Sequence, residues 1–250
     1  MRPAGGKAPT ESGCRTIGSR MFQTDLGRAD AVLAALEKKR PEVAAHSRRV
    51  SAYSVRLAVQ FGLADDVIET IRVGALLHDV GKMLTPSRIL DKPGRPNARE
   101  WQELKLHPEL GREICHRSGF DGEVGAIVLH HHERCDGSGY PDRLKHPAIP
   151  YTVRIVSVMD TFDALTSSRD YRDRLSLEAA RTLIARSAGS KYCPWVVTGL
   201  LALPVEMLQP GSGGVPQAVR RPEGPASLPI GSLAGFRLPG RSGLLDAARS

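Results

Sequence analysis

The sequence contains few aromatic residues, few cysteines and no long apolar run. Aromatic residues make up 5% of its 250 residues, and its four cysteines are scattered without a CxxC pair. So few cysteines exclude a disulfide framework, and we expect reduced thiols. No segment approaches the roughly 18 consecutive apolar residues of a membrane span, and the first residues lack the apolar stretch of a secretory signal. We therefore expect a cytoplasmic protein whose core is mostly aliphatic.

The net charge of +8 is not concentrated in one basic patch. Residues 1–28 carry five basic and two acidic side chains, and residues 205–250 carry five basic and three acidic ones. The two ends thus contribute five of the eight charges, which leaves little excess for the middle of the chain. Because a dedicated nucleic-acid binder needs a clustered basic surface, we expect no nucleic-acid polymer as a partner.

Composition also divides the chain into three parts. The first 28 residues lack periodicity, and residues 205–250 hold six prolines and eight glycines. Both compositions favour disorder. We therefore predict a disordered leader at 1–28, one folded domain at 29–204 and a disordered tail at 205–250. Since only about 28 residues precede the domain, we expect regulation by signalling proteins in trans.

The folded part shows helical periodicity and no useful alternation of apolar and polar residues. Pro41 suits a first helical turn, Gly62 is a natural helix stop, and apolar residues recur between them at helical spacing. Further helices are expected at about 65–78, on both sides of His107, and at about 121–131, 150–167, 176–188 and 193–203. The sequence therefore predicts an all-α fold, a helical bundle with one long loop.

Six of the eight histidines occur near carboxylates or near one another, at helix ends or on apolar helix faces. A single histidine of this kind is more often an ordinary core or surface residue, as we expect for His116 and His146. Asp160 lies in an otherwise apolar helix, where an unpaired carboxylate is costly to bury. Nitrogen and carboxylate ligands without thiolate suit Fe, Mn or Zn. Seven or eight such ligands exceed the capacity of one ion. The sequence therefore predicts two or three divalent metal ions, with Fe or Mn favoured.

Four motifs in this order resemble a known family. HDVGK at 78–82, HPELG at 107–111, HHERCDGSGYP at 131–141 and DTFDALTSSRDYR at 160–172 are similar to the HD-GYP family of HD-superfamily metal-dependent phosphohydrolases. The resemblance spans about 29–203. It implies a bundle of about seven helices with a bimetallic or trimetallic centre that hydrolyses cyclic di-GMP to pGpG or GMP.

The resemblance also implies roles for individual residues. Asp79 and Lys82 would be catalytic, and Lys82, Tyr140, Arg169 and Arg172 would contact the substrate. His130 precedes the motif and is expected to be a bystander. The implied metal ligands are Glu42, His46, His78, Asp79, His107, His131, His132 and Asp160, with Glu42 serving a third ion.

The sequence departs from the family pattern in places. Asp170 stands where the family often has proline. Its carboxylate can pair with an arginine, which would weaken the contact of Arg169 and Arg172 with phosphate. Cys193 stands where an aspartate is usual, so the following helix is expected to be capped less well. Two alternatives stay open: another HD-type nucleotide phosphohydrolase, and a non-catalytic module that binds cyclic di-GMP and signals by contact.

Overall fold

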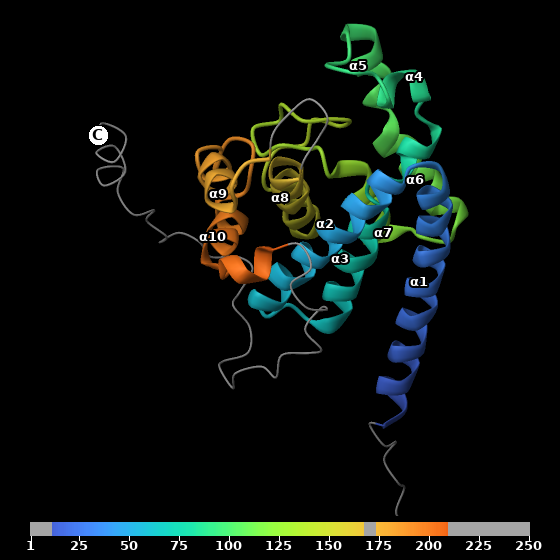
Figure 1. The fold of residues 1–250 in the computed structure, drawn as a ribbon. Helices are drawn as coiled ribbons and strands as arrows, with labels where there is room; N and C mark the ends of the chain where they lie inside the picture. Colours follow the sequence, from blue (N-terminus) through green and yellow to red (C-terminus); the bar gives the residue numbers. More distant parts are fainter. Residues whose placement is uncertain (1–11, 168–173, 210–250) are drawn as a thin grey trace, which may run out of the picture. The chain divides into compact units, whose positions relative to one another are not determined.

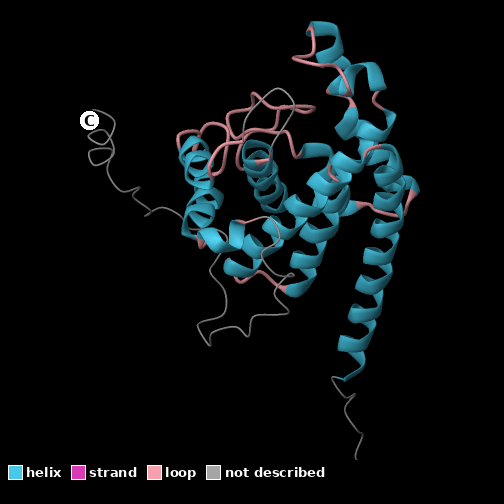
Figure 2. Ribbon diagram, in the orientation of Figure 1, coloured by secondary structure: helices cyan, strands magenta, loops and turns pink. Residues whose placement is uncertain are grey.

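The structure, a computed structural model, describes residues 12–167 and 174–209, and side chains from Asp25 onward. Within these residues it is helical, with two isolated backbone bridges and no strand. Figure 2 shows helices joined by loops throughout. The predicted all-α fold is confirmed.

The helices of Figure 1 follow the predicted order, with shorter segments inserted between them. The 3-10 turn η1 follows α3, and a second one, η2, follows α10. The elements are α1 (Ser12–Lys39), α2 (Pro41–Gln60), α3 (Asp65–Leu77), η1 (Val80–Leu84), α4 (Ser87–Leu90), α5 (Ala98–Leu104), α6 (His107–Arg117), α7 (Gly122–His130), α8 (Tyr151–Thr166), α9 (Leu177–Ala185), α10 (Pro194–Ala202) and η2 (Val205–Leu208).

Local sequence explains several of these boundaries. Pro41 begins α2, and Gly62 adopts a φ of 66° just after its end, a conformation that glycine reaches without steric cost. Asn97 and Glu100 form a reciprocal capping box at the start of α5. Asn97 thus marks the start of this helix.

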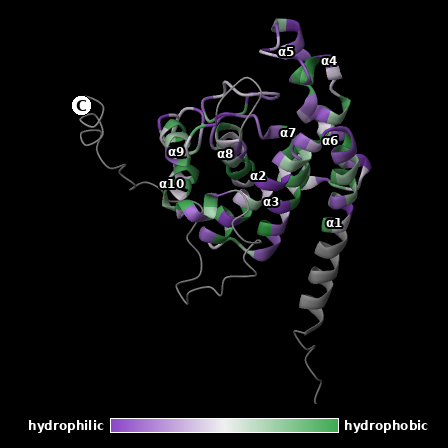
Figure 3. Ribbon diagram, viewed as in Figure 1, coloured by the Kyte–Doolittle hydropathy of each residue, from purple (hydrophilic) through white to green (hydrophobic). Residues whose placement is uncertain are grey.

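Two groups of buried apolar side chains stabilise the bundle. The α8 core cluster joins α8 to α2, α9 and α10, with Tyr53, Met159 and Phe162 at most 2% exposed. The α1 core cluster joins α1 to α3, α6 and α7, with Leu33, Leu77 and Val128 at most 1% exposed. Figure 3 shows apolar residues gathered on α10 and hydrophilic ones on α5. Two separate groups of buried apolar side chains therefore hold the helices of the bundle in place.

Helical structure extends past both predicted boundaries of the folded domain. Helix α1 begins at Ser12, inside the predicted disordered leader, and packs against α2 and α3. Its Leu26, Ala29, Leu33 and Leu36 recur at helical spacing and pack in the α1 core cluster. At the other end, η2 lies inside the predicted tail, and its Leu208 is fully buried. Residues 1–11 and 210–250 lie outside the described residues.

No helix in the described part of the chain combines the length and the apolar character needed to cross a membrane.

Candidate metal centre

Three helix ends each present a histidine in the same way. The Nδ1 atoms of His78, His107 and His131 lie 2.8, 2.7 and 2.9 Å from the carbonyl oxygens of Ala75, Leu104 and Val128, three residues earlier in each case. A carbonyl only accepts a hydrogen bond, so Nδ1 carries the proton and Nε2 keeps its lone pair. A second hydrogen bond of this kind is what orients a metal-binding imidazole.

The Nε2 atoms of His107, His131 and His132 meet at one point, which we call the imidazole half of the site. His107 Nε2 lies 3.3 Å from His131 Nε2 and 3.2 Å from His132 Nε2. Asp79 Oδ1 lies 3.3 Å from His107 Nε2 and 3.8 Å from His131 Nε2. One ligand atom from each of these four residues lies within 4.8 Å of the others.

His46, His78 and Asp160 form the carboxylate half on the other side of Asp79. Asp160 Oδ1 lies 3.0 Å from His46 Nε2 and 3.8 Å from His78 Nε2. Asp79 Oδ2 lies 3.7 Å from His46 Nε2 and 3.4 Å from His78 Nε2. The two oxygens of one buried carboxylate therefore face the two halves, an arrangement that suits a carboxylate bridging two cations.

The site has polar atoms that the protein itself does not satisfy. His78 Nε2 and Asp79 Oδ1 are buried and lack a hydrogen-bond partner. The lone pairs of the imidazole half also face one another, and unpaired buried polar atoms of this kind are costly. Divalent cations would satisfy all of them at once, and the nitrogen and oxygen donors without thiolate suit Fe, Mn or Zn. The residues present therefore fit metal binding.

The two halves have opposite electrostatic character. Burial would lower the pKa of His46, but the carboxylates of Asp160 and Asp163 raise it to about 9. Burial lowers the pKa of His132 to about 3 and, helped by the neighbouring imidazoles, holds the pKa of His131 well below its usual value. His131 and His132 are therefore neutral at neutral pH, with lone pairs available to a cation.

Lys82 lies beside the shared carboxylate. Its ammonium group donates a hydrogen bond to Asp79 Oδ2. Burial would raise the pKa of Asp79, but Lys82 and His78 hold it well below the ordinary value. Asp79 is thus an ionised ligand candidate at neutral pH.

A glycine allows the HD segment to approach α6. A Cβ atom at Gly81 would lie 1.9 Å from the carbonyl oxygen of His107. Only a residue without a side chain fits at this distance. The contact between η1 and α6 is therefore what brings Asp79 beside the imidazole half.

Sequence reasoning missed two residues that hold the carboxylate half in place. Asp163 is 1% exposed and accepts hydrogen bonds from His46 Nδ1 at 2.7 Å and from Arg49 Nε at 2.7 Å. This carboxylate orients the His46 ring so that its Nε2 faces the site. Sequence spacing could have indicated both residues. Asp163 follows Asp160 by three residues and Arg49 follows His46 by three, so each lies on the same helix face as a ligand candidate.

The structure brings together seven of the eight ligands expected from the resemblance. The exception, Glu42, is exposed on α2, one turn before His46, and belongs to neither group of ligand atoms. Tyr140 stacks on His132, with ring centroids 4.8 Å apart. His130 Nε2 lies 2.8 Å from Asp142 Oδ2, apart from the ligand groups. Arg169 and Arg172 lie outside the described residues.

A helical bundle with a histidine–aspartate pair at its centre and convergent ligands from α2, α6, α7 and α8 defines the HD class of metal-binding folds. The HD domain family matches residues 31–196, and the chain belongs to this family. The family expected from the four motifs is thereby confirmed.

Several named proteins are similar to this chain. It is 40% identical over 169 residues to "3'3'-cGAMP-specific phosphodiesterase 2" of Vibrio cholerae, a match that covers 67% of this chain and 32% of that protein. It is 39% identical over 171 residues to "Cyclic di-GMP phosphodiesterase response regulator RpfG" of Xanthomonas campestris, covering 67% of this chain and 45% of that protein. The chain thus matches less than half the length of these relatives.

A solved structure shares the fold. A HDG"Y"P protein from Bdellovibrio bacteriovorus superposes with a TM-score of 0.54 at 22% sequence identity, covering 76% of this chain and 61% of that one. This likeness supports the helical HD fold.

Proposed function

We propose that this protein hydrolyses a phosphodiester bond of a cyclic dinucleotide, with cyclic di-GMP as the favoured substrate. The reaction requires divalent metal ions and yields pGpG or GMP. The observation that carries the proposal is the Asp79 carboxylate, whose two oxygens face two separate groups of imidazole ligands. The names of the two relatives support the substrate class. The reaction would take place in the cytoplasm.

The proposed metal ligands are Asp79 and the six residues of the two halves, with Fe or Mn as the preferred ions. Two divalent ions in such a site stabilise charge on the phosphoryl oxygens and supply hydroxide at neutral pH. Glu42 would join only if a third ion binds, since its side chain is exposed one turn from His46. The Asp163 carboxylate, held by Arg49, orients His46.

The remaining groups act on the substrate. The Lys82 ammonium lies beside the shared carboxylate, where it can neutralise charge that develops on the phosphoryl oxygens. Tyr140 forms a wall next to His132. Arg169 and Arg172 stay proposed phosphate contacts, since a guanidinium matches the geometry of phosphate oxygens.

Product analysis on a nucleotide panel tests this function. The full chain, purified without oxygen and loaded with Fe or Mn, is incubated with cyclic di-GMP, 3'3'-cGAMP and nucleoside monophosphates, and the products are separated by chromatography. We expect cleavage of a cyclic dinucleotide that stops on metal removal and in the His78→Ala variant. Undiminished cleavage by metal-free protein would refute the mechanism. Cleavage of monophosphates alone would favour another HD-type phosphohydrolase, and tight binding of cyclic di-GMP without turnover would favour a signalling module.

The 40% identity to a relative named for 3'3'-cGAMP is a specific reason to include that nucleotide. Signalling proteins that act in trans stay proposed partners.

A further inference from the structure

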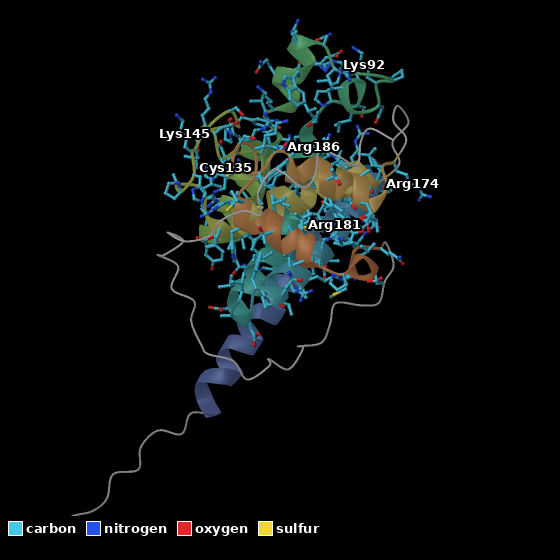
Figure 4. All side chains as sticks on the ribbon, turned by 90° about the vertical axis from the view of Figure 1, so that its left-hand side faces the viewer. Lys92, Cys135, Lys145, Arg174, Arg181 and Arg186 are labelled. Atoms are coloured by element: carbon cyan, nitrogen blue, oxygen red, sulfur yellow. The ribbon has the colours of Figure 1, made fainter. Side chains whose placement is uncertain are left out.

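A cavity of about 420 Å³ lies beside the metal centre, outside the ligand groups. One wall comes from α5, α6 and the residues between them, and the other from the loop that follows α7. We call this cavity the loop pocket; its lining includes Gln102, Lys105, Leu106, Ser138, Tyr140 and Arg143. Figure 4 marks the loop by Cys135 and Lys145, which lie close together where the loop folds back on itself.

Tyr140 belongs to both the loop pocket and the edge of the metal centre. Its ring stacks on His132 at 4.8 Å between centroids, with 30° between the ring planes. The same ring also meets Trp101 edge-to-face, with 6.5 Å between the ring centroids. Trp101 is 42% exposed, so this aromatic surface faces solvent. The loop pocket and the metal centre therefore share the Tyr140 ring as a common boundary.

Two cations line the pocket without an acidic partner. Lys105 Nζ lies 5.3 Å from the centre of the Tyr140 ring and 5.8 Å from that of Trp101. Neither Lys105 nor Arg143 forms an ion pair with any residue that the structure describes. The acidic lining residue is Glu109, so the pocket keeps a net positive charge. Cations beside exposed aromatic rings suit an anionic ligand that carries a flat ring.

The backbone holds Arg143 in an unfavourable conformation at the pocket. Its φ is 55°, the one positive value at a non-glycine residue in the described part of the chain. Glu133 imposes this conformation, because its buried carboxylate accepts hydrogen bonds from the amides of Asp142 and Leu144 at 2.7 and 3.0 Å, on both sides of Arg143. Glu133 follows His132 directly. A strained residue fixed by the metal-binding segment points to a function for that residue.

We infer that the loop pocket binds the half of the cyclic dinucleotide that is not being cleaved, with Lys105 and Arg143 on its second phosphate and Trp101 and Tyr140 beside its base. The inference rests on the proposed function, and it assigns a binding role to residues outside the ligand set. Contacts to a group remote from the reacting bond act equally on bound substrate and transition state, so they lower KM more than they raise kcat.

The test compares a substrate that has a second phosphate with one that lacks it. Lys105→Ala and Arg143→Gly are measured on cyclic di-GMP and on bis(p-nitrophenyl) phosphate; glycine accepts the positive φ, so the loop is not strained further. We expect KM for cyclic di-GMP to rise about 10-fold or more with kcat nearly unchanged. We expect no change with bis(p-nitrophenyl) phosphate and partial recovery in Arg143→Lys. Lys145→Ala, an exposed lysine of the same loop outside the pocket, is the matched control.

Three results would overturn the inference. The first is an unchanged KM for cyclic di-GMP in both variants, and the second is an equal loss on both substrates, which indicates general damage to the site. The third is an equal effect of Lys145→Ala. Failure of the unaltered protein to cleave either substrate would instead refute the proposed function, on which the inference depends.

Discussion

The two halves of the site use the same ligand type in opposite environments. In the carboxylate half, His46 lies between Asp160 and Asp163, which raise its pKa to about 9. In the imidazole half, burial lowers the pKa of His132 to about 3, and the nitrogen lone pairs face one another. The carboxylate half pairs the charge of His46 internally but leaves His78 Nε2 without a partner, whereas the imidazole half places three ring nitrogens against one another. Asp79 is the residue that both depend on.

Each half also rests on a different part of the hydrophobic core. The α8 core cluster surrounds the part of α8 that carries Asp160 and packs against α2, which carries His46. The α1 core cluster includes Cys115 of α6 and Val128 of α7, the helices that present His107 and His131. The relative position of the halves is therefore set by helix packing.

The largest effect is expected from Asp79→Asn, because this residue serves both halves. The amide keeps the size of the side chain and removes its charge. We expect fewer than two ions per chain and a loss of turnover of about 1,000-fold or more, since metal ions supply several kcal/mol of transition-state stabilisation. Elemental analysis and kcat measurements check this. The control is Asp142→Asn, whose carboxylate is 55% exposed, and equal loss in the control would contradict the bridging role.

Asp163→Asn is expected to weaken only the carboxylate half. It removes the charge that orients His46 through Nδ1, and loss of such a partner costs about 10- to 100-fold in metal affinity. Competition with a chelator measures the affinity of each ion separately. We expect one ion to be released at lower chelator concentration while the other is retained. Simultaneous release of both ions would show that the halves are not independent.

How much the sequence predicts differs between the two halves. His131, His132 and the HD pair stand in contiguous motifs, so the resemblance to the HD-GYP family implies a ligand role for each of them. Asp163 and Arg49 were missed because their importance comes from a contact between α2 and α8, 114 residues apart in the chain. Helix α1 was partly missed because its apolar stripe of Leu26, Ala29, Leu33 and Leu36 is confined to the second half of the helix, and the half before it is rich in glycine, serine and arginine. Helix α1 contributes to the stability of the fold by packing on α2 and α3.

Leu33→Ala is expected to lower stability with little change in the turnover of folded protein. Leu33 is 1% exposed in the α1 core cluster, and such a truncation costs about 2–5 kcal/mol of unfolding free energy. Chemical denaturation measures the loss. Leu183→Ala, at a leucine that is 42% exposed, should cost much less. Equal stability of the two variants would mean that α1 does not contribute to the core.

The smallest effect is expected from His130→Ala. Its ring pairs with the exposed Asp142 and belongs to neither ligand group. We expect unchanged metal content and a change in kcat of less than about 3-fold, because the contact with Asp142 lies apart from the ligand groups. A loss comparable with that of His131→Ala would place His130 in the ligand set and require a different assignment of the three consecutive histidines.

The most direct test of the account is the location of bound metal in crystals of the full chain, measured by anomalous scattering at the absorption edge of Fe or Mn. The account predicts two peaks about 3.5–4 Å apart, one on each side of the Asp79 carboxylate. A single peak, or peaks away from Asp79, would contradict it.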